Sequence, residues 1–284
     1  MENKMPPQHQ DAQPGLEYEM NPKPIYIREG YKGSEKLKNK VALITGGDSG
    51  IGRAVAVHFA REGADLAICY HPREEQDAQK TKRLVEAEGQ KCLLLPGDLL
   101  ETSYVQKTVD TVIDTYKRIN ILVNNAANHV EQKEFVNISD KQMTDTFALN
   151  ILAMFRLTKA VLPHMKAPDC IINTSSVVSY RGSESLIDYA STKGAVTAFT
   201  RSLSKNLVEQ GIRVNQVAPG PIWTPLIVAT KPPEEVAEFG QDVPMKRPGQ
   251  PAELGPAYVF LACEDASYIT GQSIHVNGGE AVNA

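Results

Sequence analysis

Short apolar runs alternate with longer amphipathic segments from about residue 40 to the C-terminus. Runs rich in Val, Ile and Leu predict buried strands at about 41–44, 66–70, 92–95, 121–123, 170–174, 213–217 and 273–276. Helices are predicted between them. The first ends near residue 62 and the second near residue 88, three more span 103–116, 140–165 and 188–209, and the last begins near residue 251. This alternation predicts an α/β fold with a single, doubly wound parallel sheet and helices on both faces.

The first 37 residues do not follow this pattern. Prolines at positions 6, 7, 14, 22 and 24 interrupt any helical or strand period, which fits a flexible tail. Apolar residues such as Tyr18, Met20 and Tyr26 are unusual in a fully solvated arm, however. We therefore expect residues 1–37 to form a partly ordered extension that lies along a subunit surface from about Leu16, within reach of a neighbour. The remaining residues, 38–284, are expected to form one domain.

Composition narrows the class of protein. A chain of 284 residues with 42% hydrophobic and 23% charged residues fits a soluble globular protein. Its net charge of −4 and the lack of a dense Lys/Arg stripe argue against nucleic acid as a partner. No apolar run approaches the roughly 20 residues of a membrane span. Scattered cysteines without a Cys-x-x-Cys pair predict a cytoplasmic protein, and the histidine spacing predicts no catalytic metal.

Three polar side chains are predicted to meet at the end of one strand and the start of a helix. Tyr189 and Lys193 are four residues apart, so on a helix they share a face. Ser176 comes just after the strand at 170–174. The pKa of a phenol, about 10 in water, falls when a nearby ammonium stabilises the phenolate. The set predicts an acid/base site, although the Tyr-Lys spacing alone also fits an ordinary amphipathic helix.

A glycine-rich segment, Thr45 to Gly52, follows the first predicted strand. We expect Gly46 to permit a tight turn, Gly50 to let the backbone approach a pyrophosphate, and Gly52 to allow close helix packing. The helix N-terminus would offer amide groups and positive dipole character to the phosphates. Placed after the first of several parallel strands, this segment predicts a Rossmann-type dinucleotide-binding fold.

Several motifs follow one another along the chain: the glycine segment, Asn124-Asn125-Ala126-Ala127, Asn150, the Ser/Tyr/Lys set and Pro219-Gly220. Together they resemble the short-chain dehydrogenase/reductase family from about Lys38 to the C-terminus. Within that family the chain is most similar to bacterial members with an N-terminal extension, described as stress-associated or as homologues of glucose and polyol dehydrogenases. The resemblance implies reversible hydride transfer between NAD or NADP and a carbonyl or secondary alcohol in a sugar, a polyol or a small ketone.

The resemblance also implies a catalytic set of Asn150, Ser176, Tyr189 and Lys193. Tyr189 would exchange the substrate proton, and Lys193 would lower the pKa of Tyr189 and bind the nicotinamide ribose. Ser176 would donate to the substrate oxygen. Asn150 would bend its helix and hold a water linked to the lysine, with a purely structural role as the alternative.

A larger set is implied to bind the cofactor. Its members are Gly46, Asp48, Ser49, Gly50, Ile51, Gly52, Tyr70, Arg73, Asp98, Leu99, Asn125, Ala126, Ala127, Tyr189, Lys193, Pro219, Gly220, Ile222 and Thr224. Asp98 would contact the adenine, cap the following helix, or do both.

Many NAD-binding proteins carry an acid at the end of the second strand. Here Tyr70-His71-Pro72 stands at that place, followed by Arg73, which can meet a 2′-phosphate. We predict NAD or NADP, with a slight preference for NAD.

The segment from Thr224 to about Met245 lacks a clear period and is expected to form a substrate loop over the carboxyl ends of the strands. Trp223 either faces the substrate or packs in the core, and His129 is expected to be a solvated loop residue near the site.

Two other functions stay open: a ketoacyl-type reductase, which would need a basic docking patch, and a non-catalytic dinucleotide-binding regulatory protein. Family analogy predicts a homotetramer built through the helices at 103–116, 140–165 and 188–209.

Overall fold

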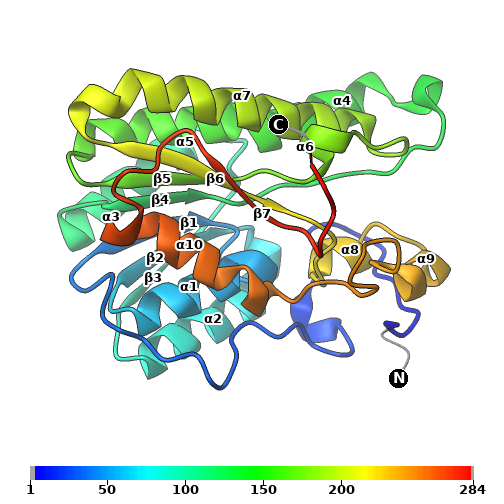
Figure 1. Ribbon diagram of the computed structural model, residues 1–284, viewed down its shortest axis with the longest axis horizontal. Coiled ribbons are helices and arrows are strands. Elements are labelled where there is room, and N and C mark those ends of the chain that lie inside the picture. The colour runs from blue at the N-terminus through cyan, green and yellow to red at the C-terminus, as the bar shows by residue number, and fades with distance from the viewer. Residues whose placement is uncertain (1–3, 283–284) are drawn as a thin grey trace.

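All strands of the sheet run parallel, in the order β3-β2-β1-β4-β5-β6-β7 (Figure 1). The computed structural model describes residues 4–282. Its strands are β1 (Val41–Thr45), β2 (Asp65–Tyr70), β3 (Cys92–Pro96), β4 (Ile121–Asn124), β5 (Cys170–Thr174), β6 (Arg213–Pro219) and β7 (Ser273–Val276). The direction of winding reverses between β1 and β4, so the carboxyl ends of these two strands flank the crevice where α/β sheets bind ligands. The predicted fold class is confirmed.

Two layers of helices cover the sheet (Figure 1). One layer holds α1 (Gly50–Arg61), α2 (Glu75–Ala87) and α10 (Gly255–Ala262); the other holds α3 (Thr102–Tyr116), α4 (Asp140–Phe147), α5 (Met154–Val161) and α7 (Ile187–Leu207). The short helices are α6 (Val178–Arg181), α8 (Pro225–Val228) and α9 (Pro233–Glu238). The apolar strands β1, β4 and β5 are fully buried because both faces of the sheet are covered.

The helix predicted at 140–165 is not one regular α-helix. A π-helical turn, Ala148–Ala153, separates α4 from α5, and the segment ends in a 3₁₀ turn at Leu162–His164. By length and composition alone, Asp140–His164 could cross a membrane, but here it packs against α3 and α7. The π turn contains Asn150, and such turns frequently mark functional sites.

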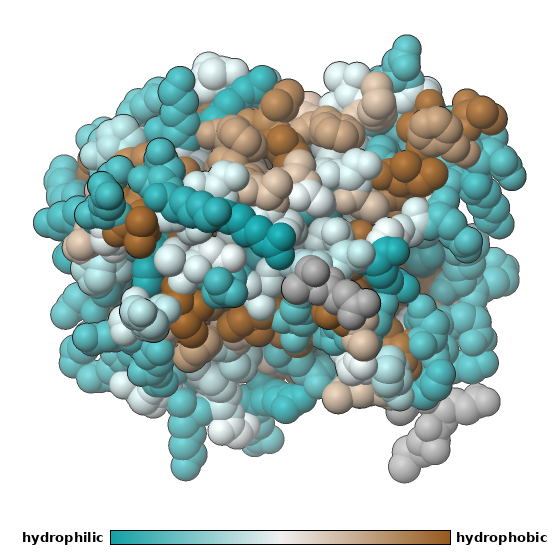
Figure 2. All heavy atoms as spheres, turned by 45° about the horizontal axis from the view of Figure 1, so that its top comes forward, coloured by the Kyte–Doolittle hydropathy of each residue, from teal (hydrophilic) through white to brown (hydrophobic). Residues whose placement is uncertain are grey.

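Apolar side chains gather among polar ones on the face formed by α4, α5 and α7 (Figure 2). Leu152 and Phe155 are 47% and 48% exposed, and the Phe155 ring packs on Phe199 at 4.3 Å between centroids. Exposed apolar patches of this kind are typical of protein interfaces. The homotetramer expected through these helices stays a prediction.

The N-terminal arm, residues 4–37, packs on its own chain. Met20 is buried in an apolar cluster with Trp223, Val228 and Val236. The Trp223 indole donates to the Pro22 carbonyl at 3.0 Å, and the backbone N–H of Gln10 donates to the Val228 carbonyl at 2.8 Å. The arm therefore runs along the segment that carries α8 and α9, and Trp223 is a core residue.

A buried ion-pair network joins the arm to the glycine turn. The Glu17 carboxylate accepts the backbone N–H of Gly50 at 2.8 Å and pairs with Arg53, whose guanidinium also contacts Asp77 at 3.0 Å. The Glu17, Arg53 and Asp77 side chains are at most 1% exposed. Removing one partner from such a buried network leaves buried charge incompletely compensated, which is strongly destabilising.

The substitution Glu17→Ala is expected to lower the free energy of unfolding by about 3 kcal/mol, because it leaves the Gly50 amide without its partner and the buried Arg53 guanidinium with Asp77 as its one remaining close carboxylate. Urea denaturation measures this loss. The matched control is Asp145→Ala, which breaks the exposed ion pair between Lys141 and Asp145 and should change stability by about 0.5 kcal/mol or less. Equal effects of the two substitutions would show that the arm contributes nothing through Glu17.

Candidate active site

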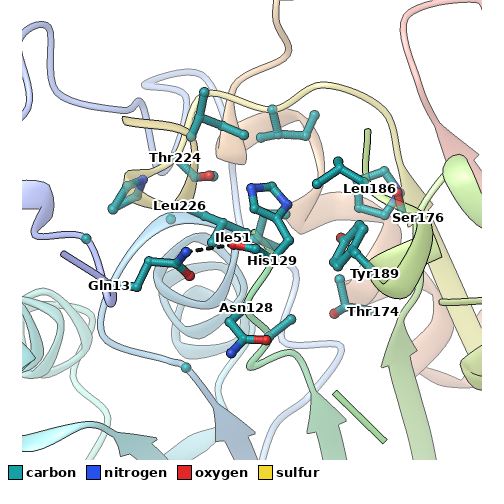
Figure 3. Close-up of a pocket in the computed structure, with 18 of the residues that line it drawn as sticks. Gln13, Ile51, Asn128, His129, Thr174, Ser176, Leu186, Tyr189, Thr224 and Leu226 are labelled. Carbon is teal, nitrogen blue, oxygen red and sulfur yellow. Dashed lines mark hydrogen bonds between the residues drawn. The ribbon is translucent and has the colours of Figure 1, made fainter. Parts of the chain in front are cut away.

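A cavity of about 950 Å³ opens at the carboxyl ends of the strands (Figure 3). Its walls come from the glycine turn after β1 and from the segments that follow β2 to β6. Most residues predicted for the site line it: Gly46, Asp48, Ser49, Gly50, Ile51, Tyr70, Asp98, Leu99, Asn125, Ala126, Ala127, Ser176, Tyr189, Lys193, Pro219, Gly220, Ile222 and Thr224. Gly52 and Asn150 do not line the cavity but contact residues that do, Gly46 and Asn128. Arg73 does not line the cavity.

The glycine turn has the geometry needed for a phosphate-bearing ligand. Gly46 and Gly50 have φ values of +62° and +49°, in the left-handed region that favours glycine. A Cβ on Gly52 would lie 1.8 Å from the Gly46 carbonyl oxygen, so α1 packs on the turn as predicted. The Asn125 amide steadies the turn by donating to the carbonyls of Thr45 and Gly46, at 3.1 and 3.2 Å. The turn and the N-terminus of α1 therefore fit the diphosphate of a dinucleotide, although the Gly50 amide is already bonded to Glu17.

Tyr189, Lys193 and Ser176 meet at the opposite side of the cavity, as predicted. Tyr189 lies in the first turn of α7, and the Lys193 ammonium lies 5.5 Å from the centre of its ring. The ammonium donates to the Thr174 carbonyl at the end of β5, at 2.8 Å. Ser176 follows the same strand and shares a hydrogen bond with the Tyr189 hydroxyl. One strand end thus fixes both the cation and the hydroxyl partner of the phenol.

The ionisation of the phenol differs from the prediction. Burial raises the pKa of Tyr189 to about 12, and only the hydrogen bond with Ser176 opposes the rise. Burial lowers the pKa of Lys193 to about 8, so this side chain remains mainly an ammonium at neutral pH. Lys193 faces the ring and the Thr174 carbonyl, and in this structure it does not lower the pKa of Tyr189 below its ordinary value. Tyr189 is therefore a neutral phenol here.

Asn150 makes its contacts from the π turn. Its side chain accepts from the Asn128 N–H and donates to the Asn128 carbonyl, both at 2.9 Å, and donates to the Thr192 hydroxyl at 3.1 Å. The interruption of the helix at Asn150 agrees with the expected distortion. What the structure shows directly is that Asn150 fixes the segment after β4.

The structure brings two carboxyl groups together in the cavity: Asp48, which was predicted to bind the cofactor, and Glu74, which was not. Asp48 and Glu74 line the cavity and are 1% and 8% exposed. Burial raises the pKa of both, and the charge and hydrogen bond of Asp48 raise that of Glu74 further, to about 10. The Asp48 Oδ2 atom is buried without a partner. The sequence does not indicate Glu74, because it lies among charged residues and only the fold turns it towards Asp48. Arg73, expected near a 2′-phosphate, is exposed.

Asp98 does not cap α3, whose N-cap residue is Glu101, so that expected role is wrong. Its carboxylate accepts the backbone N–H of Leu100 at 2.9 Å, before α3 begins at Thr102. Asp98 also lines the cavity, and its contact with the adenine stays a prediction.

The prediction that His129 is a solvated loop residue is wrong. Its side chain lines the cavity and the residue is only 5% exposed. The imidazole packs edge to face with Tyr189, at 5.1 Å between centroids and an interplanar angle of 83° (Figure 3). Its Nε2 atom lies 2.9 Å from the Thr230 hydroxyl. Burial, helped by the charges of Lys231 and Lys193, lowers the pKa of His129 to about 4, against a smaller opposing effect of Asp188.

The segment predicted as a substrate loop carries α8 and α9 and lies over this part of the cavity. Lys231 joins it to the segment after β4 through an ion pair with Glu131 at 2.5 Å. The arm reaches the same point, because the Gln13 amide donates to the His129 carbonyl at 2.7 Å (Figure 3). We refer to residues 224–245 as the lid.

Acid should destabilise the protein partly through His129. A histidine with a pKa near 6.5 when unfolded and about 4 when folded binds its proton first in the unfolded state. Its contribution to stability is therefore complete above pH 6.5 and is lost as the pH falls towards 4. The pKa difference is worth roughly 3 kcal/mol.

The substitution His129→Gln is expected to flatten the dependence of unfolding free energy on pH between 6.5 and 4, as measured by urea denaturation at several pH values. His164→Gln, at an exposed position, is the control and should leave the wild-type slope. A variant at His129 that keeps the full slope would mean that this ring is not held neutral by burial.

The fold and the cavity at its switch point are those of a dinucleotide-binding α/β protein. A family model described as enoyl-(acyl carrier protein) reductase matches residues 46–280. Over 278 residues the chain is 53% identical to general stress protein 39 of Bacillus subtilis, covering 98% of this chain and 97% of the relative. The chain belongs to the short-chain dehydrogenase/reductase family and is an oxidoreductase.

Two further comparisons bear on the site. Glucose and ribitol dehydrogenase of Daucus carota is 46% identical over 283 residues, covering 98% of this chain and 97% of that protein. A crystal structure of a short-chain dehydrogenase from Burkholderia cenocepacia in complex with NADP is 27% identical with a TM-score of 0.78, covering 86% of this chain and 98% of that chain. The similarity to N-terminally extended stress and polyol dehydrogenase homologues is thereby confirmed.

Proposed function

We propose that Tyr189 is the acid/base group of a reversible reaction between a nicotinamide cofactor and a carbonyl or secondary alcohol. The observation that carries this assignment is the position of the phenol, which contacts Ser176 and Lys193 in the cavity that the glycine turn opens into. The set of four side chains is complete, which favours a catalyst over a binding protein without turnover.

A bound nicotinamide supplies the hydride donor or acceptor. In reduction, the neutral Tyr189 phenol donates its proton to the oxygen of the substrate. Ser176 donates a second hydrogen bond to that oxygen and stabilises the charge that develops there. In oxidation the phenolate takes the proton, and the positive charge of an oxidised nicotinamide, added beside Lys193, would lower the pKa of Tyr189. Asn150 holds the segment after β4 in place through its hydrogen bonds to the backbone of Asn128.

The substitution Tyr189→Phe removes the proton donor and should lower kcat by about 10²–10⁴-fold. The absorbance of the reduced nicotinamide follows turnover, and fluorescence titration should show that the cofactor still binds. The control is Tyr180→Phe, because the Tyr180 hydroxyl bonds Ser273 and Gln216 outside this cavity. Near-normal turnover in Tyr189→Phe would contradict the assignment.

We also propose that the protein prefers NAD to NADP. Asp48 and Glu74 form a buried carboxyl pair that retains negative charge at neutral pH, and the unpartnered Oδ2 of Asp48 can accept from a ribose 2′-hydroxyl. A 2′-phosphate at the same place would meet a like charge in a poorly solvated site. The Burkholderia structure holds NADP, so the proposed preference rests on the carboxyl pair and not on that neighbour.

The substitution Asp48→Asn should lower the ratio of kcat/KM for NAD to kcat/KM for NADP by about tenfold or more, because it removes the charge that opposes the phosphate. The control Glu75→Gln lies close by but is exposed and outside the cavity, so it should keep the wild-type ratio. The proposal would be contradicted if the wild-type enzyme preferred NADP, or if Asp48→Asn left the ratio of the two kcat/KM values unchanged.

The charges around the lid favour a small polar substrate over a carrier-bound one. A carrier-bound acyl group calls for a basic docking patch, whereas the acidic side chains that line this part of the cavity outnumber the basic ones. The acidic residues are Glu131, Glu184, Glu235, Glu238 and Asp242, and the basic ones are Arg181 and Lys231. A sugar, a polyol or a small carbonyl compound is therefore the proposed substrate class.

A further inference from the structure

The segment just after the Asn-Asn-Ala-Ala motif holds two buried polar atoms without partners, on residues that line the cavity. The Nδ1 atom of His129 and the Oδ1 atom of Asn128 are both buried and make no hydrogen bond. Both residues line the cavity that contains Tyr189 (Figure 3). Leaving a buried polar group unsatisfied is unfavourable by about 1–3 kcal/mol, so two adjacent examples at one wall need an explanation.

The hydrogen bonds of the lid decide which kind of partner His129 requires. The Thr230 hydroxyl has one proton, which it donates to the Leu226 carbonyl at 2.6 Å. The contact of 2.9 Å between Thr230 Oγ1 and His129 Nε2 must then be donated by the imidazole. Because the ring is neutral at physiological pH, the remaining nitrogen, Nδ1, carries a lone pair and no proton. His129 therefore offers an acceptor and needs a donor.

The position of this acceptor is fixed from several sides. Asn150 holds the backbone of Asn128 on both its N–H and its carbonyl, and Gln13 of the arm holds the His129 carbonyl. Thr230 fixes the plane of the imidazole from the lid. Groups preorganised in this way lose little entropy when a ligand binds to them.

The acceptor also lies close to the reacting centre. The His129 ring packs on the ring of Tyr189, whose hydroxyl would exchange the substrate proton. A substrate oxygen held by Tyr189 and Ser176 would thus have a neighbouring carbon within reach of His129. A donor on that carbon, a second hydroxyl, would satisfy the unpaired Nδ1, with the Asn128 amide available to the next group along the substrate.

We propose that His129, supported by Asn128, is a specificity-determining residue that accepts a hydrogen bond from a hydroxyl next to the reacting carbon. The inference rests on the proposed function and narrows its substrate class to vicinal diols, sugars and α-hydroxy carbonyl compounds. A monofunctional alcohol of equal length leaves the acceptor buried and unpaired, and sites built to bond a hydroxyl reject analogues that lack it.

The test compares oxidation of 2,3-butanediol and 2-butanol, which have the same carbon chain and differ in one hydroxyl. Wild type should show a higher kcat/KM for the diol, and His129→Phe should lower the ratio of the two kcat/KM values by about 10–100-fold. The phenylalanine keeps a ring against Tyr189 but has no acceptor. His129→Gln restores an amide acceptor and should recover part of the ratio.

His275 provides the matched control. It also has a buried Nδ1 without a partner and an edge-to-face contact with a tyrosine, Tyr180, at 4.6 Å, but it lies outside this cavity. His275→Phe should keep the wild-type ratio. Equal losses for both alcohols in His129→Phe, or the same ratio change in His275→Phe, would overturn the inference.

A second measurement reads the contact without turnover. In the ¹⁵N spectrum of histidine-labelled protein saturated with oxidised cofactor, the His129 Nδ1 resonance should move when 2,3-butanediol is added and stay in place with 2-butanol. A resonance that responds to neither alcohol, or equally to both, overturns the inference. A selective response without oxidation of either alcohol would support this contact and contradict only the proposed function.

Discussion

The structure of the site depends on a buried ammonium held beneath a phenol. Lys193 is 3% exposed and donates to a backbone carbonyl, that of Thr174, at 2.8 Å. Burial lowers the pKa of this cation, and here the carbonyl at the end of β5 faces the second turn of α7 and supplies its hydrogen-bond acceptor. This contact fixes the position of β5 relative to α7 and with it the separation of Ser176 and Tyr189. In the absence of further positive charge, burial keeps the phenol protonated.

Contacts outside the Rossmann-type core hold the other walls of the cavity. The arm bonds the glycine turn through Glu17 and the segment after β4 through Gln13, and it packs on the lid through Met20. The lid in turn bonds His129 through Thr230. The cofactor side and the substrate side of the cavity are therefore joined by a segment that precedes the fold in the sequence. An arm in this role acts within its own chain, which does not require a neighbouring subunit.

The sequence was sufficient for features that depend on local pattern. The apolar strands, the glycine turn and the four-residue spacing of Tyr189 and Lys193 are each set by neighbours in the chain, and the structure has all three. The family motifs supplied Asn150, whose polar side chain within an apolar segment marks the π turn. The expected direction of the Tyr189 pKa shift was wrong because burial, which the sequence does not reveal, raises the pKa, and only Ser176 opposes the rise.

Other features could not be predicted because they depend on distant contacts. Glu74 lies among several charged residues, and only the fold turns its carboxyl group towards Asp48. His129 lies in a polar segment that predicts solvent exposure, and it is buried by the lid, about a hundred residues later in the chain. Glu17 lies in a proline-rich arm whose partners, Arg53 and Gly50, belong to the domain. Burial of a polar group can be recognised from sequence only when its partners are also known.

The most direct test of this account is the ionisation of Tyr189 itself, followed by the ¹³Cζ resonance of labelled tyrosine as the pH is raised. In the protein alone, Tyr189 should remain a phenol past pH 10, and binding of oxidised cofactor should bring its ionisation to lower pH because a positive charge is added beside Lys193. An ionisation at or below pH 10 in the protein alone, or one that the oxidised cofactor does not shift, would contradict the account.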